Sequence, residues 1–381
     1  MKRRLVILTE LIAPYRIPVF NALAHRPDVD LHVIFLSRTD SSMREWRVYE
    51  EEIRFSYEVL PCWRKRVGKY NGLLNRGLAN ALRLTSPDAI ICGGYNYVSS
   101  WQALRWAKRN RVPFLLWSES TSDDQRSRHA LLELLKRKFL ENCDAFVVPG
   151  KSARDYLEQF GLPLGKIFVA PNAVDTALFS RLRDLEVERR NPLRSQLGLP
   201  DKYFLFVGRL VRAKGVFDLL GAYTLLPSAL RQQFGLVLAG EGPSRSELEC
   251  LARDIYPGVV QFAGFVHREE LPGYYTLAEC FVFPTHTDPW GLVVNEAMAC
   301  GLPVICTRIA GCAADLVRAN GRLVSAGDVG ELAAAMEDIA RDPALRGRMA
   351  SESRELIRTY SPESCAAGLA DASSALEAHA R

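Results

Sequence analysis

Short apolar runs alternate with segments of helical period from one end of the chain to the other. In the first half, the apolar runs are residues 4–9, 30–37, 88–94, 113–118, 144–150 and 166–172. The segments of helical period between them lie near 15–25, 70–84, 97–109, 127–142 and 151–160. This alternation is typical of parallel sheets with crossover helices. We therefore predict a doubly wound, Rossmann-like α/β domain over residues 1–178.

A second set of apolar runs begins after residue 200. They are residues 203–209, 234–242, 259–266, 279–285, 302–308 and 321–327. The stretch before them, residues 179–200, is rich in charge and contains proline, and we interpret it as a linker. Residues 201–360 then form a second Rossmann-like domain, and residues 361–381 a C-terminal helix. Ligands of such sheets bind outside the carboxyl ends of the strands, so two such units predict a central cleft that both face.

The composition argues against several classes of protein. A chain of 381 residues suits two domains of roughly 150 to 200 residues, and 48% hydrophobic and 24% charged residues are typical of a globular protein. Nine cysteines without a Cys-x-x-Cys pair and six dispersed histidines argue against a disulfide framework and a metal site, and indicate the cytoplasm. A net charge of +5 without one long basic tract argues against nucleic acid as a partner. No apolar run approaches the roughly 18 residues of a membrane span.

Two cations follow the first apolar run of the second domain. Arg209 leaves the end of the predicted strand, and Lys214 stands with Gly215 at the start of a predicted helix. Glycine lets backbone approach closely, and two cations beside a helix N-terminus suit a diphosphate. The alternative is a solvated loop in which Arg209, Arg212 and Lys214 only face water.

Two carboxylates flank another predicted helix start. Asp288 lies in a loop, and Glu296 lies about one and a half turns into the helix that follows. Carboxylates accept hydrogen bonds from hydroxyls, and the exposed N–H groups of Gly291, Leu292 and Val293 suit phosphate oxygens. These groups would therefore bind a ligand that has hydroxyls at both ends and phosphate between them, and a nucleotide-sugar is such a ligand. The alternative is that Asp288 caps the helix and Glu296 is a surface residue.

The segment "DPWGLVVNEAMACGLPVI" resembles the signature of two glutamates separated by seven residues in retaining glycosyltransferases of family 4, which have the GT-B fold. The segment "VGRLVRAKGVFDLL" resembles the diphosphate-binding segment of that family, and "VAPNAVDTALF" its interdomain stretch. With "LVLAGEGP" and "VVQFAGFV", these segments cover most of residues 145–325 in the expected order.

The resemblance implies a role for each candidate residue of the second domain. Arg209 and Lys214 would neutralise the donor diphosphate, Glu296 would hold the ribose hydroxyls, and Asp288 would contact the hydroxyls of the donor sugar. The nucleobase would pair with backbone near Gly264, Phe265 and Val266. The sequence departs from the family in having Asp288 in place of glutamate and Ala173 in place of the usual glycine. The glycine-rich loop often found after the first strand is also absent, which leaves the acceptor side undefined.

The first domain carries three candidates for the acceptor side. Arg16 follows Tyr15 at a predicted helix start, where it could meet an acceptor or a phosphate, or simply be part of the cap. Tyr95 lies in the glycine turn "GGYNYVSSW". Glu119 ends a predicted strand, near where many relatives carry a histidine that contacts the sugar; it could orient or deprotonate an acceptor hydroxyl, or be structural. We interpret His286, close to Asp288, as a loop histidine.

Together these features predict a retaining glycosyltransferase that moves a sugar from a nucleoside-diphosphate donor to a hydroxyl of a glycan, lipid-linked or small-molecule acceptor. We expect neither a metal ion nor another cofactor, because the cations replace the metal. Two alternatives remain open: a nucleotide-sugar epimerase or hydrolase of GT-B fold, and a non-catalytic nucleotide-sugar sensor. The sequence does not distinguish a UDP donor from a GDP donor, since the contacts to the base are expected to be made by backbone atoms.

Residues 63–83 combine six basic residues and no acid with interleaved Trp, Tyr and Leu. This pattern predicts a helix that lies on the anionic inner face of a membrane and binds it reversibly. The alternative is a helix packed on the core with a solvated basic face, because Leu74, Leu78 and Leu82 also form a normal buried stripe.

Overall fold

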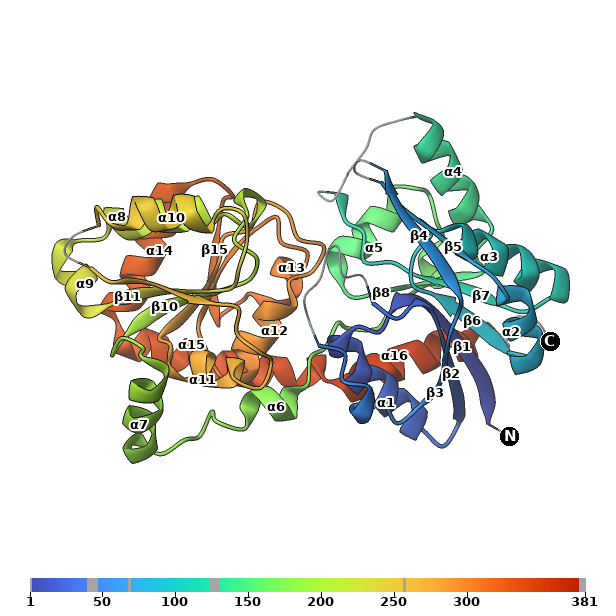
Figure 1. Ribbon diagram of the computed structural model, residues 1–381, viewed down its shortest axis with the longest axis horizontal. Helices are drawn as coiled ribbons and strands as arrows, with labels where there is room; N and C mark the ends of the chain where they lie inside the picture. The colour runs from blue at the N-terminus through green and yellow to red at the C-terminus, as the bar shows by residue number, and fades with distance from the viewer. Residues whose placement is uncertain (1, 40–46, 68–69, 123–129, 256–257, 377–381) are drawn as a thin grey trace. The chain divides into compact units, whose positions relative to one another are not determined.

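The computed structural model describes residues 2–39, 47–67, 70–122, 130–255 and 258–376 (Figure 1). The chain divides into two compact units. The first comprises residues 1–174 and 361–381, and the second comprises residues 175–360. Each unit is a parallel sheet covered by helices, so the predicted doubly wound α/β class is confirmed.

The first unit is built on a parallel sheet that has seven strands in the described part of the chain. Their order is β3-β2-β1-β6-β7-β8-β9. The strands are β1 (Arg3–Leu11), β2 (Val29–Ser37), β3 (Ser56–Val59), β6 (Ala89–Cys92), β7 (Phe114–Trp117), β8 (Ala145–Val148) and β9 (Ile167–Val169). All six predicted apolar runs of this half coincide with strands. Of the strands in this sheet, the prediction missed β3, a short edge strand with little buried surface.

Alternate residues of β1 face two different cores. Leu5 and Ile7 pack with α1 (Ile17–His25) and α16 (Pro362–Ala375), which lie side by side in Figure 1. Val6 and Leu8 pack on the other face with four helices: α2 (Leu78–Thr85), α3 (Val98–Asn110), α4 (Ala130–Glu141) and α5 (Lys151–Glu158). Because both faces are covered, the strands are continuous apolar runs. The C-terminal helix therefore completes the core of the first unit.

The predicted helix over residues 63–83 is wrong for most of its length. Residues Cys62–Val67 form β4 and Tyr70–Asn75 form β5, which pair as an antiparallel hairpin. Helix α2 begins only at Leu78, after Gly77 with φ +87°. Glycine is unfavourable in a helix interior, and the segment contains three glycines. The leucine spacing that suggested one helical stripe spans two elements, and Leu74 faces solvent while Leu82 is buried.

The second unit is built on a parallel sheet with six strands in the described residues, in the order β12-β11-β10-β13-β14-β15. The strands are β10 (Tyr203–Val207), β11 (Gly235–Ala239), β12 (Val260–Gly264), β13 (Cys280–Phe283), β14 (Val304–Thr307) and β15 (Gly321–Val324). All six predicted runs coincide with these strands. The strand order reverses between β10 and β13, and ligands of open α/β sheets bind at such a switch point.

The helices of the second unit include two that precede its sheet. They are α6 (Thr176–Ser180), α7 (Val187–Leu197), α8 (Val216–Leu225), α9 (Ser228–Gln233), α10 (Arg245–Ala252), α11 (Leu271–Leu277), α12 (Leu292–Ala299), α13 (Ala313–Leu316), α14 (Val329–Arg341) and α15 (Pro343–Leu356). The short 3-10 helices η5 (Arg212–Lys214) and η6 (Ile357–Tyr360) complete the set.

The predicted linker, residues 179–200, is not an irregular connection. Helix α7 occupies half of it and belongs to the second unit, whose first residue is Asp175. Two leucines of this segment, Leu193 and Leu197, pack beside Gly273 of α11. The charge that suggested a linker lies on the solvated sides of this helix, which tolerates Pro192 in its interior.

In the part of the chain that the structure describes, no helix is both long enough and apolar enough to cross a membrane.

Candidate active site

Glycines hold the loops at the carboxyl edge of the second sheet close together. The N–H of Gly208 donates to the carbonyl of Ala239 at 3.0 Å, and the N–H of Gly240 donates to the carbonyl of Gly264 at 2.7 Å. A Cβ atom at Gly240 would lie 1.9 Å from the carbonyl oxygen of Gly208. The loops that follow β10, β11 and β12 therefore form one tight backbone surface at this edge.

The loop after β10 is joined to the loop after β13. Gly215, with φ +67°, starts α8, and a Cβ atom there would lie 1.8 Å from the carbonyl oxygen of Pro284. The N–H of His286 donates to the carbonyl of Ala213 at 2.9 Å. This contact brings η5, which carries Lys214, next to the loop that carries Asp288.

Lys214 and Asp288 form an ion pair between Nζ and Oδ2. Their side chains are 24% and 17% exposed, so the pair is mostly shielded but open to solvent on one side. The other carboxylate oxygen, Oδ1, accepts the backbone N–H of Trp290 at 3.0 Å. Asp288 thus pairs with the Lys214 ammonium and also stabilises the turn that leads into α12.

The start of α12 is fixed by its neighbours. Gly291 has φ +98°, and a Cβ atom there would lie 2.7 Å from the ring of Phe283. The indole of Trp290 is buried, and its Nε1–H donates to Asn295 Oδ1 at 2.9 Å. The first N–H groups of a helix, here from Gly291 to Val293, have no acceptor within the helix. They supply the partial positive charge that suits a phosphate.

Glu296 lies on the same helix and is partly exposed. The hydroxyl of Tyr275 donates to its Oε2 at 2.8 Å. Burial raises the pKa of Glu296 to about 7, and the Tyr275 hydrogen bond and the charge of Arg268 oppose this rise. The carboxylate is therefore close to half-protonated at neutral pH, whereas an ordinary surface glutamate is fully ionised.

The remaining donor candidates lie at the same edge of the sheet. Arg209 is exposed after β10, and its side chain makes no hydrogen bond or ion pair with any residue that the structure describes. Gly264, with φ +73°, ends β12. Phe265 is exposed with its ring edge-on to that of His267, and Val266 is partly exposed. All the predicted donor residues thus follow β10, β12 or β13 of one sheet.

Three partners of these residues have no recognisable motif in the sequence. Asp218 of α8 pairs with Nε2 of His286, so this loop histidine has a defined partner. Tyr275 and Arg268 act on Glu296 from the segment before β13. The only signal in the sequence is a run of two tyrosines in an apolar helix, which is ordinary for a core. Among the described residues, no group of three or more His, Cys, Asp or Glu could hold a metal ion.

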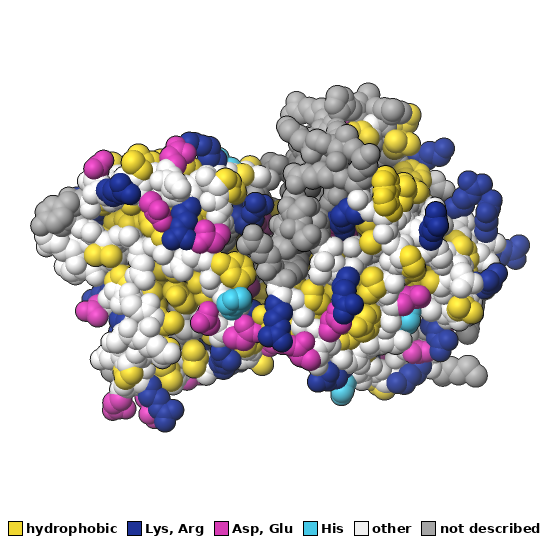
Figure 2. Space-filling model, in the orientation of Figure 1, with side chains coloured by type: hydrophobic (Ala, Val, Ile, Leu, Met, Phe, Trp, Pro, Cys, Tyr) yellow, Lys and Arg dark blue, Asp and Glu magenta, His cyan; other side chains and the backbone are white. Residues whose placement is uncertain are grey.

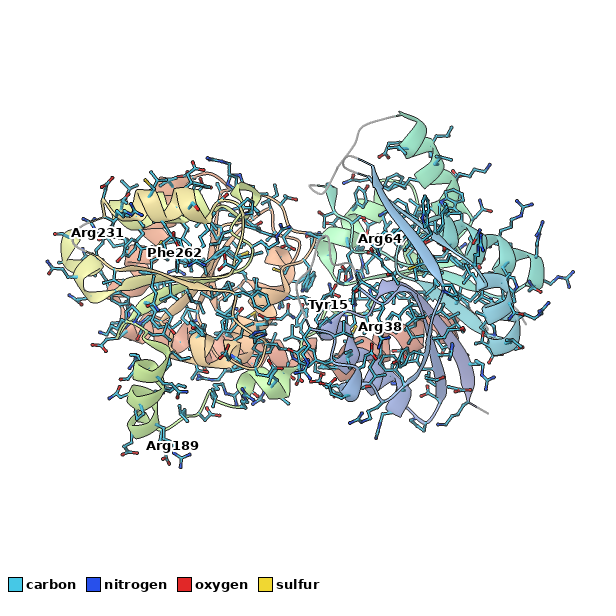
Figure 3. The ribbon with its side chains drawn as sticks, in the orientation of Figure 1. Tyr15, Arg38, Arg64, Arg189, Arg231 and Phe262 are labelled. Carbon is cyan, nitrogen blue, oxygen red and sulfur yellow. The ribbon has the colours of Figure 1, made fainter. Side chains whose placement is uncertain are left out.

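In the first unit, Arg16 and Glu119 form an ion pair. Asn172 joins them: its Oδ1 accepts from Arg16 at 3.4 Å, and its Nδ2 donates to Glu119 Oε1 at 3.0 Å. The Arg16 guanidinium lies 3.9 Å from the centre of a Trp117 ring and 5.6 Å from that of Tyr15, which Figure 3 labels. Burial lowers the pKa of Arg16 more than any other single effect does. The charges of Glu119, Tyr15 and Cys365 and the hydrogen bond to Glu119 together outweigh it, so the net shift of the pKa is upward.

Tyr95 belongs to a different cluster of the first unit. Its ring centre lies 6.0 Å from that of Phe139, and the ammonium of Lys136 lies 5.8 Å from its centre. Both neighbours are on α4. The structure therefore brings Arg16, Glu119 and Asn172 together and does not show Tyr95 among them. Asn172 was not predicted as a member of this cluster.

The sequence matches two families, each over one unit. Residues 21–178 match the family described as Glycosyltransferase Family 4, and residues 189–356 match Glycosyl transferases group 1. The chain is 32% identical over 239 residues to the D-inositol 3-phosphate glycosyltransferase of Xylanimonas cellulosilytica, covering 60% of this chain and 56% of that protein. It is 28% identical over 165 residues to the O-antigen chain mannosyltransferase B of Escherichia coli, covering 43% of each. The matched region thus spans about half the length of these curated relatives.

The crystal structure of Anabaena HepE in complex with UDP and glucose superimposes with a TM-score of 0.76 at 17% identity, covering 98% of this chain and 100% of that one. This likeness shows the fold, GT-B, and agrees with the two parallel-sheet units. With the two family matches on either side of the unit boundary, it follows that the chain belongs to the group 1 glycosyltransferases of the family 4 type.

Proposed function

We propose that the protein is a retaining glycosyltransferase that moves a sugar from a nucleoside-diphosphate donor to a hydroxyl of an acceptor. The observation that carries the proposal is the pairing of Lys214 with Asp288 beside the N-terminus of α12, which also bears Glu296. Relatives support the reaction class: one is named a D-inositol 3-phosphate glycosyltransferase, another an O-antigen chain mannosyltransferase, and HepE was crystallised with UDP and glucose.

The chemistry of the proposed reaction is mainly electrostatic. Negative charge builds on the leaving diphosphate as the glycosidic bond breaks, and Lys214, Arg209 and the helix N-terminus stabilise it. The diphosphate takes the proton of the acceptor hydroxyl on the same face of the sugar, so the configuration is retained. Two cations at this position allow the reaction without a metal ion or another cofactor.

Glu296 binds the ribose hydroxyls, and Asp288 acts at the donor sugar. The base is bound through the backbone of residues 264–266, which end an edge strand of the sheet. UDP and GDP both fit such contacts, so the donor is tested with both.

The acceptor side of the proposal rests on Glu119. Its Oε1 accepts from both Arg16 and Asn172, whereas its Oε2 makes no hydrogen bond with any described residue. The side chain is 34% exposed, so Oε2 is accessible to a hydroxyl. A carboxylate with one oxygen anchored and one free is suited to orient an acceptor hydroxyl.

Incubation with UDP- and GDP-sugars and a crude lipid or polysaccharide extract tests the reaction. A glycosyltransferase releases nucleoside diphosphate only when an acceptor is present. A hydrolase releases it without an acceptor, an epimerase changes the sugar without release, and a sensor does neither. NMR of the product gives the anomeric configuration, and the assay with a chelator tests independence from metals.

Glu296→Ala is expected to raise the KM for the donor by about tenfold or more while kcat changes by no more than a few-fold. Contacts to the ribose persist from the ground state to the transition state, so their loss removes uniform binding. Steady-state kinetics over a range of donor concentrations measure both constants. A large loss of kcat at unchanged KM would assign Glu296 to the reacting sugar instead.

We also propose that the first unit binds an anionic bilayer reversibly, through the hairpin rather than a helix. Residues 61–112 contain ten Lys or Arg and one acid, Asp88. Trp63 and Leu74 are cross-strand partners on the hairpin, and they are 60% and 48% exposed. Figure 2 shows Lys and Arg side chains gathered at the edge of this unit over α2 and α3. Exposed apolar side chains on a segment rich in positive charge match an anionic lipid surface.

The double variant Trp63→Ser/Leu74→Ser and the charge variant Lys65→Gln/Arg66→Gln are both expected to lose most binding to anionic vesicles at low salt. Each basic residue near such a surface contributes about 1 kcal/mol, and salt screens that attraction. Co-sedimentation with phosphatidylglycerol-containing vesicles measures the bound fraction. Leu164→Ser, which alters another exposed leucine of the same unit, serves as the control. Equal binding by all four proteins would show that the hairpin is not the membrane contact, and no binding by the wild type would point to a water-soluble acceptor.

A further inference from the structure

The two carboxylate oxygens of Glu296 have different surroundings. Oε2 accepts the hydroxyl of Tyr275 at 2.8 Å. Oε1 makes no hydrogen bond with any residue in the described part of the chain, and the side chain is partly exposed. One oxygen is therefore anchored inside the protein while the other is available to a ligand.

Tyr275 is held rigidly from two sides. The residue is fully buried, and its ring lies 6.0 Å from that of Phe179 at 77° and 5.6 Å from that of Phe281 at 60°. Its hydroxyl also lies 3.4 Å from the carbonyl oxygen of Val293, one turn before Glu296 on α12. Burial raises the pKa of Tyr275 well above its usual value, and the charge of Glu296 raises it further. The phenol is therefore a neutral donor at neutral pH.

Few other charged groups face Glu296. Arg268 favours its ionised form, but that guanidinium also pairs with Asp175 at 3.2 Å. The thiol of Cys300, one turn further along α12, has a raised pKa through burial and the charge of Glu296, and Arg183 opposes that rise. Cys300 is thus neutral. Of the groups that favour the Glu296 carboxylate, the hydroxyl of Tyr275 has the largest effect.

We propose that Tyr275 is a positioning residue for the donor: it fixes Oε2 of Glu296 so that Oε1 faces the paired ribose hydroxyls, and it favours the ionised carboxylate, which accepts from them. The proposal rests on the proposed function, because it takes Glu296 as the ribose contact. Tyr275 itself does not touch the donor. Its effect is expected in the pH dependence of nucleotide binding, which a residue that only fills space would not change.

Tyr275 stabilises the ionised form of Glu296, and this decides the direction in which the pH dependence of nucleotide binding changes. Nucleotide binding requires the ionised carboxylate, so the wild-type affinity falls as the pH drops below about 7. Tyr275→Phe removes a hydrogen bond to the ionised form and raises the pKa of Glu296. Hydrogen bonds to charged groups are strong enough to move the midpoint of binding upward by about one pH unit. At pH 7 the variant is expected to bind about fivefold more weakly, and at pH 9 nearly as well as the wild type.

Titration calorimetry with UDP and with GDP between pH 5.5 and 9 measures the midpoint. The nucleotide titrates too, but that contribution is the same for each protein and cancels in the comparison. Tyr274→Phe is the matched control: it is the adjacent residue of α11, and its hydroxyl makes no hydrogen bond with a described residue. Its midpoint is expected to equal that of the wild type. Tyr275→Phe in a Glu296→Ala background is expected to produce no shift in the pH midpoint of binding.

A second measurement does not depend on the ligand. Because the folded-state pKa of Glu296 lies above its ordinary value of 4.5, the contribution of Glu296 to stability falls as the pH rises from about 4.5 to about 7. Tyr275→Phe raises that pKa and extends the loss above pH 7. The difference in Tm between wild type and Tyr275→Phe should therefore grow between pH 6 and pH 9.

The two measurements together show whether the proposed role of Tyr275 or the proposed function of the protein fails. A midpoint shared by wild type and Tyr275→Phe, or an equal loss of affinity at every pH, overturns the proposal. A difference in Tm that does not vary with pH shows that Tyr275 does not act on Glu296, and also overturns it. If the Tm difference varies with pH as expected but the wild type binds neither UDP nor GDP, the proposed function fails, and the donor role of Tyr275 fails with it.

Discussion

Lys214→Ala is expected to lower kcat by on the order of a hundredfold or more, with a smaller change in the KM for the donor. In the structure, the ammonium is already in place before any charge develops: η5 presents it, and Asp288 holds it. A preorganised cation at a leaving group stabilises the transition state more than the ground state, so its loss appears in kcat. Arg209→Ala is expected to behave in the same way, since this guanidinium is exposed at the same sheet edge. Steady-state kinetics with the identified donor measure both effects.

Arg212 offers a matched control within the same short helix. Its guanidinium pairs with Glu247 at 2.5 Å and lies 4.1 Å from the centre of the Phe217 ring, so it is engaged away from Lys214. Arg212→Ala should leave kcat within a few-fold of wild type. Turnover within a few-fold of wild type in both Lys214→Ala and Arg209→Ala would remove these residues from the proposed chemistry.

Asp288→Asn is expected to lower kcat by on the order of tenfold to a hundredfold, with little effect on the KM for the donor. The asparagine keeps an oxygen that can accept the N–H of Trp290, so the turn into α12 is preserved. The change removes the negative charge that holds Lys214 and acts at the donor sugar. The loss should therefore be seen in turnover, and circular dichroism should show an intact fold.

A double-mutant cycle separates the two contributions of Asp288. If its main effect is to hold Lys214, Asp288→Asn should cost far less in a Lys214→Ala background, because residues that act as a pair are not additive. If it also contacts the sugar, part of the loss remains. An effect of Asp288→Asn on KM alone would mean that the roles assigned to Asp288 and Glu296 are exchanged.

The strands, and the positions of the candidate donor residues at the strand ends, could be predicted from the sequence because their signals are local. A strand buried on both faces is an apolar run, and all twelve predicted runs are strands in the structure. The segments with Arg209, Lys214, Asp288 and Glu296 each carry a motif of a few residues at a strand end. Residues 63–83 could not be predicted in the same way. Their leucines fit a helical period, and the choice of a hairpin depends on pairing Trp63 with Leu74, eleven positions away.

The partners of the functional side chains were beyond prediction for a related reason. Arg16, Glu119 and Asn172 are separated by 103 and 53 positions along the chain, and Tyr275 precedes Glu296 by 21. No local pattern links them. The raised pKa of Glu296 likewise arises from burial between helices, which is a property of packing.

The sequence by itself determined the two parallel α/β units, the family, and the chain positions of the candidate donor residues, because each of these depends on local periodicity or a short motif. Only the tertiary structure decided that residues 62–67 pair with residues 70–75 as a hairpin, that α16 returns to the first unit, and which partners hold Lys214, Glu296 and Arg16. Parallel sheets gather the carboxyl ends of strands that are far apart in the chain. The contacts made at that edge therefore exist only once the sheet is assembled.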